Sequence, residues 1–242
     1  MRMKKILLFA VAAMVGAGAL ADQYYGNGNA GSGGAVGGST LELTDDGTTI
    51  SGTFTRGLGG DFNDILVMYI DSVPGGFSTT AGFTDAGDAH RIAISVFDGT
   101  LREILNFASG FEADYAIALS PYYGGIWQLA NAGSHTWLST LNLSPLGDPA
   151  TLAYTFDFTF SDIGMGSAGE FDFTADYATY SPASLSNEGI GWSEAGGNPG
   201  NGGTYDFNGF ATYPAIPEPA TMSLLGTGVL AMVLRRKIRP GA

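Results

Sequence analysis

Cysteine is absent from this 242-residue chain, and histidine occurs only twice, at His90 and His135. Without cysteine the protein has no disulfide, no Cys-containing zinc site and no thiol nucleophile. A Ser-His-Asp triad would have to use one of the two histidines, and no G-x-S-x-G nucleophile motif occurs. We therefore identify no catalytic residue, and we expect both histidines at the surface or at strand ends.

Basic residues are scarce in the middle of the chain. Residues 22–216 contain no lysine and only three arginines, Arg56, Arg91 and Arg102, against 22 Asp and Glu residues, which gives a formal net charge of −19. Nucleic-acid binding requires a basic surface, so the composition excludes nucleic acid as a partner. A body of this charge would be repelled by anionic membranes and would attract divalent cations.

The first 21 residues have the three parts of a secretory signal peptide. A basic start, residues 1–5, is followed by residues 6–20, which are mostly apolar and carry no charge. Ala19 and Ala21 then form an A-x-A cleavage site. We expect export by the Sec machinery, removal of the peptide by signal peptidase, and a mature chain that starts at Asp22.

A second apolar segment lies close to the other end of the chain. Residues 220–234 carry no charge. As a helix they would span roughly 22 Å, less than the roughly 30 Å of a bilayer's hydrocarbon core. This length predicts a short transmembrane helix that holds the chain for a time, with a permanent anchor as the alternative. The basic residues that follow favour the cytoplasm, as does the basic N-terminus, so the body between them is expected outside. This cytoplasmic anchor consists of Arg235, Arg236, Lys237 and Arg239.

The end of the chain resembles the PEP-CTERM sorting signal. Pro217, Glu218 and Pro219, then the apolar segment, then the basic cluster occur in that order within residues 214–242. The resemblance implies an exported protein of a Gram-negative bacterium, and such tails often occur in bacteria that make exopolysaccharide. It also implies that exosortase, a membrane-embedded enzyme, recognises the Pro-Glu-Pro motif and removes the tail. The chain would thus stay in the inner membrane transiently before it reaches the cell surface or extracellular matrix.

The stretch between the two ends predicts one all-β domain. Residues 22–39 are Gly-rich and predict a flexible arm. Residues 40–213 contain about ten short strand patterns with Gly and Pro turns between them, which favours an antiparallel β-sandwich of jelly-roll type. We expect this domain to be flanked by an N-terminal signal helix and a C-terminal hydrophobic helix.

Five segments of this domain carry specific predictions. Residues 64–71 are apolar on both faces, which is typical of a central strand covered on each side. Residues 151–160 and 170–180 alternate apolar and polar side chains, and the short turn between them predicts a hairpin. Residues 91–97 also predict a strand, whereas residues 100–107 have the one helical period.

A weaker resemblance concerns the order of three strand patterns. "ILVMYIDSVPGG", "HRIAISV" and "FEADYAIAL" follow one another as in secreted sandwiches related to carbohydrate-binding modules of family 9 and DOMON-like domains. The resemblance implies a sandwich fold and transfers no ligand site.

Oxygen donors on Gly-containing loops are candidates for calcium binding. Ca²⁺ takes about six to eight oxygen ligands, and carboxylates on loops can supply them. No loop here has the EF-hand pattern, so the alternative is that these side chains shape turns. The candidates are Asp61, Asn63, Asp64, Asp85 and Asp88, with Asp45 and Asp46 on a further loop.

Two other groups of residues are candidates for carbohydrate chemistry. Trp127 and Trp137 are expected in the core, whereas Tyr122, Tyr123 and Trp192 could line a sugar-binding face. No pair of acids stands out as a glycosidase pair, and we expect the glutamates on the solvated surface. The glutamates considered are Glu42, Glu103, Glu112, Glu170, Glu188 and Glu194.

These observations favour an exported protein that is not an enzyme and has no cofactor. Its role would be that of a structural or binding component of the cell surface or exopolysaccharide matrix. The alternative is a carbohydrate-binding or calcium-dependent adhesion module with an extracellular polysaccharide as its partner. A further alternative is a secreted enzyme that acts on glycans.

Overall fold

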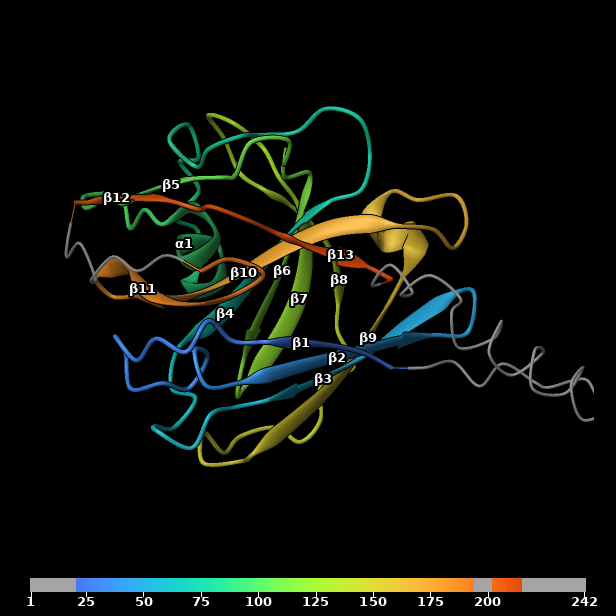
Figure 1. Cartoon of the computed structure of the whole chain (residues 1–242). Coiled ribbons are helices and arrows are strands. Elements are labelled where there is room, and N and C mark those ends of the chain that lie inside the picture. The colour runs from blue at the N-terminus through green and yellow to red at the C-terminus, as the bar shows by residue number, and fades with distance from the viewer. Residues whose placement is uncertain (1–20, 194–201, 215–242) are drawn as a thin grey trace, which may run out of the picture.

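The computed structural model describes residues 21–193 and 202–214, which form two antiparallel sheets packed face to face (Figure 1). The smaller sheet has four strands in the order β1-β2-β3-β9. Its strands are β1 (Asp22–Tyr25), β2 (Thr40–Asp45), β3 (Thr49–Thr55) and β9 (Ala153–Thr159).

The larger sheet has seven strands in the order β11-β10-β4-β6-β7-β8, and β13 shares one edge of β10 with β11. Its strands are β4 (Ile65–Asp71), β6 (Tyr115–Ser120), β7 (Tyr123–Gln128), β8 (Thr136–Thr140), β10 (Phe171–Tyr180), β11 (Ala183–Ile190) and β13 (Ala211–Tyr213). A separate parallel pair is formed by β5 (Ile104–Asn106) and β12 (Thr204–Asp206).

The prediction of a mainly β, antiparallel body is confirmed. Within the described ranges there is one α-helix, α1 (Ala89–Ser95), and one 3₁₀ turn, η1 (Phe160–Ile163). The jelly-roll connectivity stays a prediction. The two flanking helices are expected in residues 1–20 and 215–242, which lie outside the described residues.

The larger sheet is buried on both faces, and β4 shows why. Leu66, Met68 and Ile70 point into the core between the two sheets. The alternate residues Val67 and Tyr69 point into a second core, which α1 covers on the left of Figure 1. Because successive side chains of a strand point to opposite faces, a strand covered twice needs an unbroken apolar run. The prediction of a central strand at residues 64–71 is confirmed.

The segments on either side of Phe97 have the opposite structures to those predicted. Residues 91–97 do not form a strand but belong largely to α1, because the Asp88 side chain caps the helix by accepting the backbone N–H groups of His90 and Arg91. The helix ends at Val96, which adopts a left-handed conformation. Residues 100–107 are not helical, since they contain β5, which pairs with β12.

The predicted hairpin between residues 151–160 and 170–180 is also wrong, although both segments form strands. β9 pairs with β3 in the smaller sheet, whereas β10 pairs with β4, β11 and β13 in the larger sheet. The turn η1 redirects the chain between the sheets, and a capping box between Thr159 and Asp162 fixes its start.

The Gly-rich residues 22–39 differ most from their prediction, because they form no flexible arm. Residues 22–25 are β1, and Ala35 and Val36 are fully buried. Here glycine allows close backbone packing: a Cβ on Gly37 would collide with the backbone of Asn29. The segment is therefore part of the domain, which begins at Asp22 and not at residue 40.

Candidate functional site

The carboxylates proposed for calcium have partners within the protein. Asp61 lies 3.3 Å from the Arg56 guanidinium, and burial raises the pKa of Asp64. The backbone N–H groups of Asn63 and Asp64 both donate to the Tyr177 hydroxyl at 3.0 Å. This hydroxyl ties the loop that precedes β4 to β10.

The second candidate pair meets an arginine. The Arg91 Nε lies 3.7 Å from Asp85 and 3.3 Å from Asp88, and Asp88 also caps α1. Asp45 and Asp46 accept backbone N–H groups of the β2–β3 turn, and these bonds lower the pKa of Asp46. In the part of the chain that the structure describes, no group of three or more His, Asp or Glu residues is placed to hold a metal ion. The placements thus favour the turn and pairing roles over calcium.

Ser95 and His135 form a buried pair that looks like two members of a catalytic triad. His135 Nε2 lies 3.0 Å from Ser95 Oγ, and its Nδ1 accepts the backbone N–H of Ala130 at 3.1 Å. Because Nδ1 is an acceptor, the neutral ring carries its proton on Nε2 and donates it to Ser95. A ring that donates to the hydroxyl cannot remove its proton, so this pair is structural. Asp85 accepts the backbone N–H of His135 at 2.7 Å and does not reach the ring.

Because His135 is buried, we expect the free energy of unfolding to depend on pH. Burial lowers the pKa of His135 from 6.5 to about 4. The folded state therefore binds a proton on His135 less readily than the unfolded state does. The contribution of His135 to the free energy of unfolding is full above pH 6.5 and is lost as the pH falls from 6.5 toward 4. We expect the free energy of unfolding to fall by up to about 1.4 kcal/mol per pH unit in this window. Urea unfolding of His135→Gln should lack this component, and identical slopes for variant and parent would contradict the assignment.

A row of aromatic side chains crosses β7 and the edge strand β8. We call this group the aromatic edge, and it consists of Trp137, Tyr123 and Thr140, with His90 and Trp127 beside them. The Trp137 Nε1 donates to the Tyr123 hydroxyl at 3.1 Å, and that hydroxyl lies 3.4 Å from Thr140 Oγ1. His90 on α1 stacks on Trp127 and meets Tyr123 edge to face. Burial lowers the pKa of His90.

The aromatic predictions are confirmed only in part. Trp127 is buried as expected, but Trp137 is 48% exposed because β8 is an edge strand with no neighbour on its outer side among the described strands. Trp192, a candidate for the sugar-binding face, is buried and stacks on Phe207. Tyr122 is 61% exposed. His90 is half-buried and His135 is buried, so neither lies at the surface, but His135 directly precedes β8 and is at a strand end as expected.

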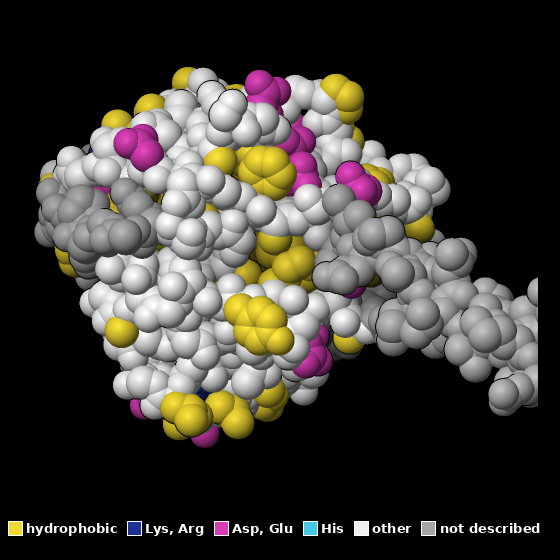
Figure 2. Space-filling view, in the orientation of Figure 1, with side chains coloured by type: hydrophobic (Ala, Val, Ile, Leu, Met, Phe, Trp, Pro, Cys, Tyr) yellow, Lys and Arg dark blue, Asp and Glu magenta, His cyan; other side chains and the backbone are white. Residues whose placement is uncertain are grey.

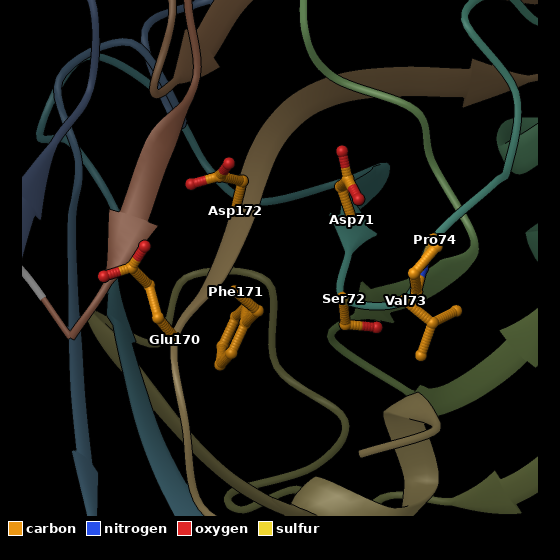
Figure 3. Close-up of a pocket in the computed structure, with 7 residues that line it drawn as sticks. All are labelled: Asp71, Ser72, Val73, Pro74, Glu170, Phe171 and Asp172. Carbon is orange, nitrogen blue, oxygen red and sulfur yellow. The ribbon is translucent and has the colours of Figure 1, made fainter.

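An acidic pocket lies where β4 ends and β10 begins (Figure 3). Asp71 and Asp172 are directly opposite each other in the β4–β10 pair, and Glu170 also lines the pocket. Desolvation raises the pKa of Asp71, and the nearby charges of Asp172 and Glu112 raise it further. Two carboxyl groups that lie side by side in a partly desolvated pocket are an arrangement that acid–base chemistry can use. The sequence showed no link between Asp71 and Asp172, because only the sheet register brings them together.

Not all acids are solvated, in contrast to the prediction. Glu103 and Glu188 are fully buried. The Glu188 carboxylate accepts four backbone N–H groups of the Gly-rich segment, at 2.7–3.1 Å, and Glu103 accepts the Leu185 N–H. Glu42, Glu112 and Glu170 are exposed as expected, and Glu194 lies outside the described residues. The donors to Glu188 are Ser32, Gly34, Val36 and Gly37.

The two ends of the body meet at one end of the sandwich, which we call the tail-side end. The Tyr24 hydroxyl on β1 donates to the Thr212 carbonyl on β13 at 2.9 Å, and the Tyr24 ring packs on Phe173. The Tyr213 hydroxyl donates to Asp45. The acidic pocket lies at this same end, since Asp172 pairs with both Asp71 and Thr212.

The predicted processing residues fall almost wholly outside the description. Asp22 starts β1, whereas Ala19, the Pro217-Glu218-Pro219 motif and the basic anchor lie outside the described residues. No helix within residues 21–193 and 202–214 is long and apolar enough to cross a membrane.

Comparison with known proteins identifies the end of the chain but not its body. No curated protein and no solved structure matches the chain, so the resemblance to family 9 carbohydrate-binding modules and DOMON-like domains has no support. A family model, the PEP-CTERM protein-sorting motif, matches residues 215–237. The prediction made from Pro217, Glu218 and Pro219 is therefore confirmed, and this chain carries a PEP-CTERM sorting motif, which implies an exported protein processed by an exosortase.

Proposed function

We propose that the body is a non-enzymatic component of the extracellular matrix of a Gram-negative bacterium, a β-sandwich of jelly-roll type delivered by its PEP-CTERM motif. The motif at residues 215–237 carries the proposal. Signal peptidase and the Sec machinery handle the N-terminus, and an exosortase handles the C-terminus. The acidic composition supports a soluble surface component, and Figure 2 shows Asp and Glu side chains on one face with hardly any Lys or Arg.

The motif follows the last described strand closely in the sequence. The last strand ends at Tyr213, so Glu218 can lie no more than roughly 18 Å away along an extended chain. The apolar segment then holds the chain in the inner membrane, and exosortase cuts beside the tail-side end of the folded body.

Processing is tested by the intact mass of the protein recovered from its host. We expect a chain that starts at Asp22 and lacks Arg235 and Arg236. A variant with Pro217, Glu218 and Pro219 all replaced by alanine should keep the full tail and stay in the inner-membrane fraction. Recovery of the parent protein with both arginines attached at steady state would overturn the proposal.

Two other functions keep specific support. The exposed aromatic edge favours a carbohydrate-binding role, which is developed below, whereas calcium-dependent adhesion has only the net charge behind it. The pairing of Asp71 with Asp172 in the acidic pocket, where desolvation raises the pKa of Asp71, favours a glycan-active enzyme. Release of reducing sugar from the host's own polymer, lost in Asp71→Asn, would establish that activity and overturn the non-enzymatic proposal.

A further inference from the structure

We infer that the aromatic edge of β7 and β8 binds a neutral polysaccharide, an inference that rests on the matrix role proposed above. Trp137 is the central residue, because 48% of it is exposed on a strand at the edge of the sheet. An aromatic ring offers a flat apolar surface on which the C–H face of a sugar ring can pack.

The exposed ring is held in place before any ligand arrives. The Trp137 indole N–H donates to Tyr123, whose hydroxyl also lies within 3.4 Å of Thr140 Oγ1. Tyr123 is in turn packed against His90, with ring centroids 5.0 Å apart. Gly125 leaves room for this arrangement, since a Cβ there would lie 2.8 Å from the Trp127 ring and 3.1 Å from the Tyr123 ring. A ring fixed in this way loses little conformational entropy on binding.

The charge of this region selects the kind of polymer. Residues 115–147, which include β6, β7 and β8, contain no Asp, Glu, Lys or Arg, in a body of net charge −19. An anionic polysaccharide would find no cation on these strands and would be repelled by the rest of the surface. A neutral polymer meets neither obstacle.

The polar groups of β8 suit the same ligand. Thr140 is exposed and lies on the same face of the sheet as Trp137, because their partners on β7 are Gly125 and Trp127. β8 has no partner strand on its outer edge among the described residues. The Thr140 hydroxyl and the free backbone groups of β8 can exchange hydrogen bonds with sugar hydroxyls beside the Trp137 ring. The site is thus an open strip suited to a chain, not a pocket for a single sugar.

Affinity gel electrophoresis of the processed protein tests this inference, with dextran, galactomannan and anionic alginate as the polymers in separate gels. We expect at least one neutral polymer to retard the protein and alginate not to do so. Trp137→Ala should weaken binding about tenfold or more, and Tyr123→Phe, which removes only the hydroxyl that orients the indole, about threefold. Tyr180→Ala is the matched control, because Tyr180 is 44% exposed on β10 and should bind like the parent.

Several results would overturn the inference. The first is that neither neutral polymer retards the protein, and the second is that the parent and Trp137→Ala are retarded equally. The third is retardation by alginate alone. The fourth is a concentration-dependent dimer that Trp137→Ala abolishes and that does not bind polymer. If Trp137→Ala fails to fold, as judged by thermal unfolding, Tyr123→Phe decides the matter. A negative result alongside a correctly removed tail would reject the glycan site and leave the proposed export and processing intact.

Discussion

Replacing Glu188 with alanine is expected to destabilise the protein by about 3–5 kcal/mol, because it removes a buried charged acceptor from four backbone donors. The donors belong to residues 32–37, which are otherwise a Gly-rich loop between β1 and β2. Unpaired N–H groups buried in this loop would each have to find water, so the loop would detach. Urea unfolding measures the loss, and hydrogen exchange of residues 32–37 shows whether it begins there.

Glu42→Ala is the control for this change. Glu42 is exposed on β2 and its side chain bonds only to Gln23 in the described structure, so the change should stay within about 0.5 kcal/mol. Equal destabilisation by both substitutions would show that the four hydrogen bonds to Glu188 do not hold the loop.

Replacing Asp176 with asparagine is expected to stabilise the protein at neutral pH. Asp176 on β10 is fully buried, and neither carboxyl oxygen has a hydrogen-bond partner in the described part of the chain. Desolvation is the main cause that raises its pKa well above the ordinary value. Burial without a partner disfavours the charged form of Asp176, and asparagine has nearly the same shape but cannot ionise.

The sign of the pH dependence follows from this shift. A carboxyl group whose pKa is raised on folding does not lower the free energy of unfolding at a pH below its unfolded-state pKa near 4. As the pH rises from there toward the folded-state pKa, the group lowers the free energy of unfolding by up to about 1.4 kcal/mol per pH unit. The advantage of Asp176→Asn should therefore be small at pH near 3 and grow toward neutrality. Urea midpoints over this range measure it. A difference between Asp176→Asn and the parent that stays constant with pH would contradict the raised pKa of Asp176.

The sequence was most informative where a pattern depends on neighbours along the chain. The double-sided apolar run of β4 and the alternation of β9 predict their strands, because burial acts on each residue in order. The sorting motif is likewise a local pattern.

Features that depend on distant partners could not be predicted. The pattern of residues 91–97 is that of a strand, but in the structure Asp88 caps a helix there. The Gly-rich segment has the composition of a flexible arm, but Glu188, more than 150 residues away, accepts its backbone N–H groups. Trp137 has a large aromatic side chain of the kind expected in a core, and only the edge position of β8 exposes it. The pairing of Asp71 with Asp172 depends on strand register, which no local signal encodes.

The contact between Tyr24 and Thr212 brings β1 beside β13, the last strand before the sorting motif. Whatever holds the chain after processing is joined beyond Tyr213, beside Asp22, so the opposite pole, where β3 leads into β4 through residues 56–64, is expected to point away from the cell. An epitope inserted in that outer loop should be readable by antibodies on intact bacteria, whereas one fused ahead of Asp22 should be shielded by the envelope.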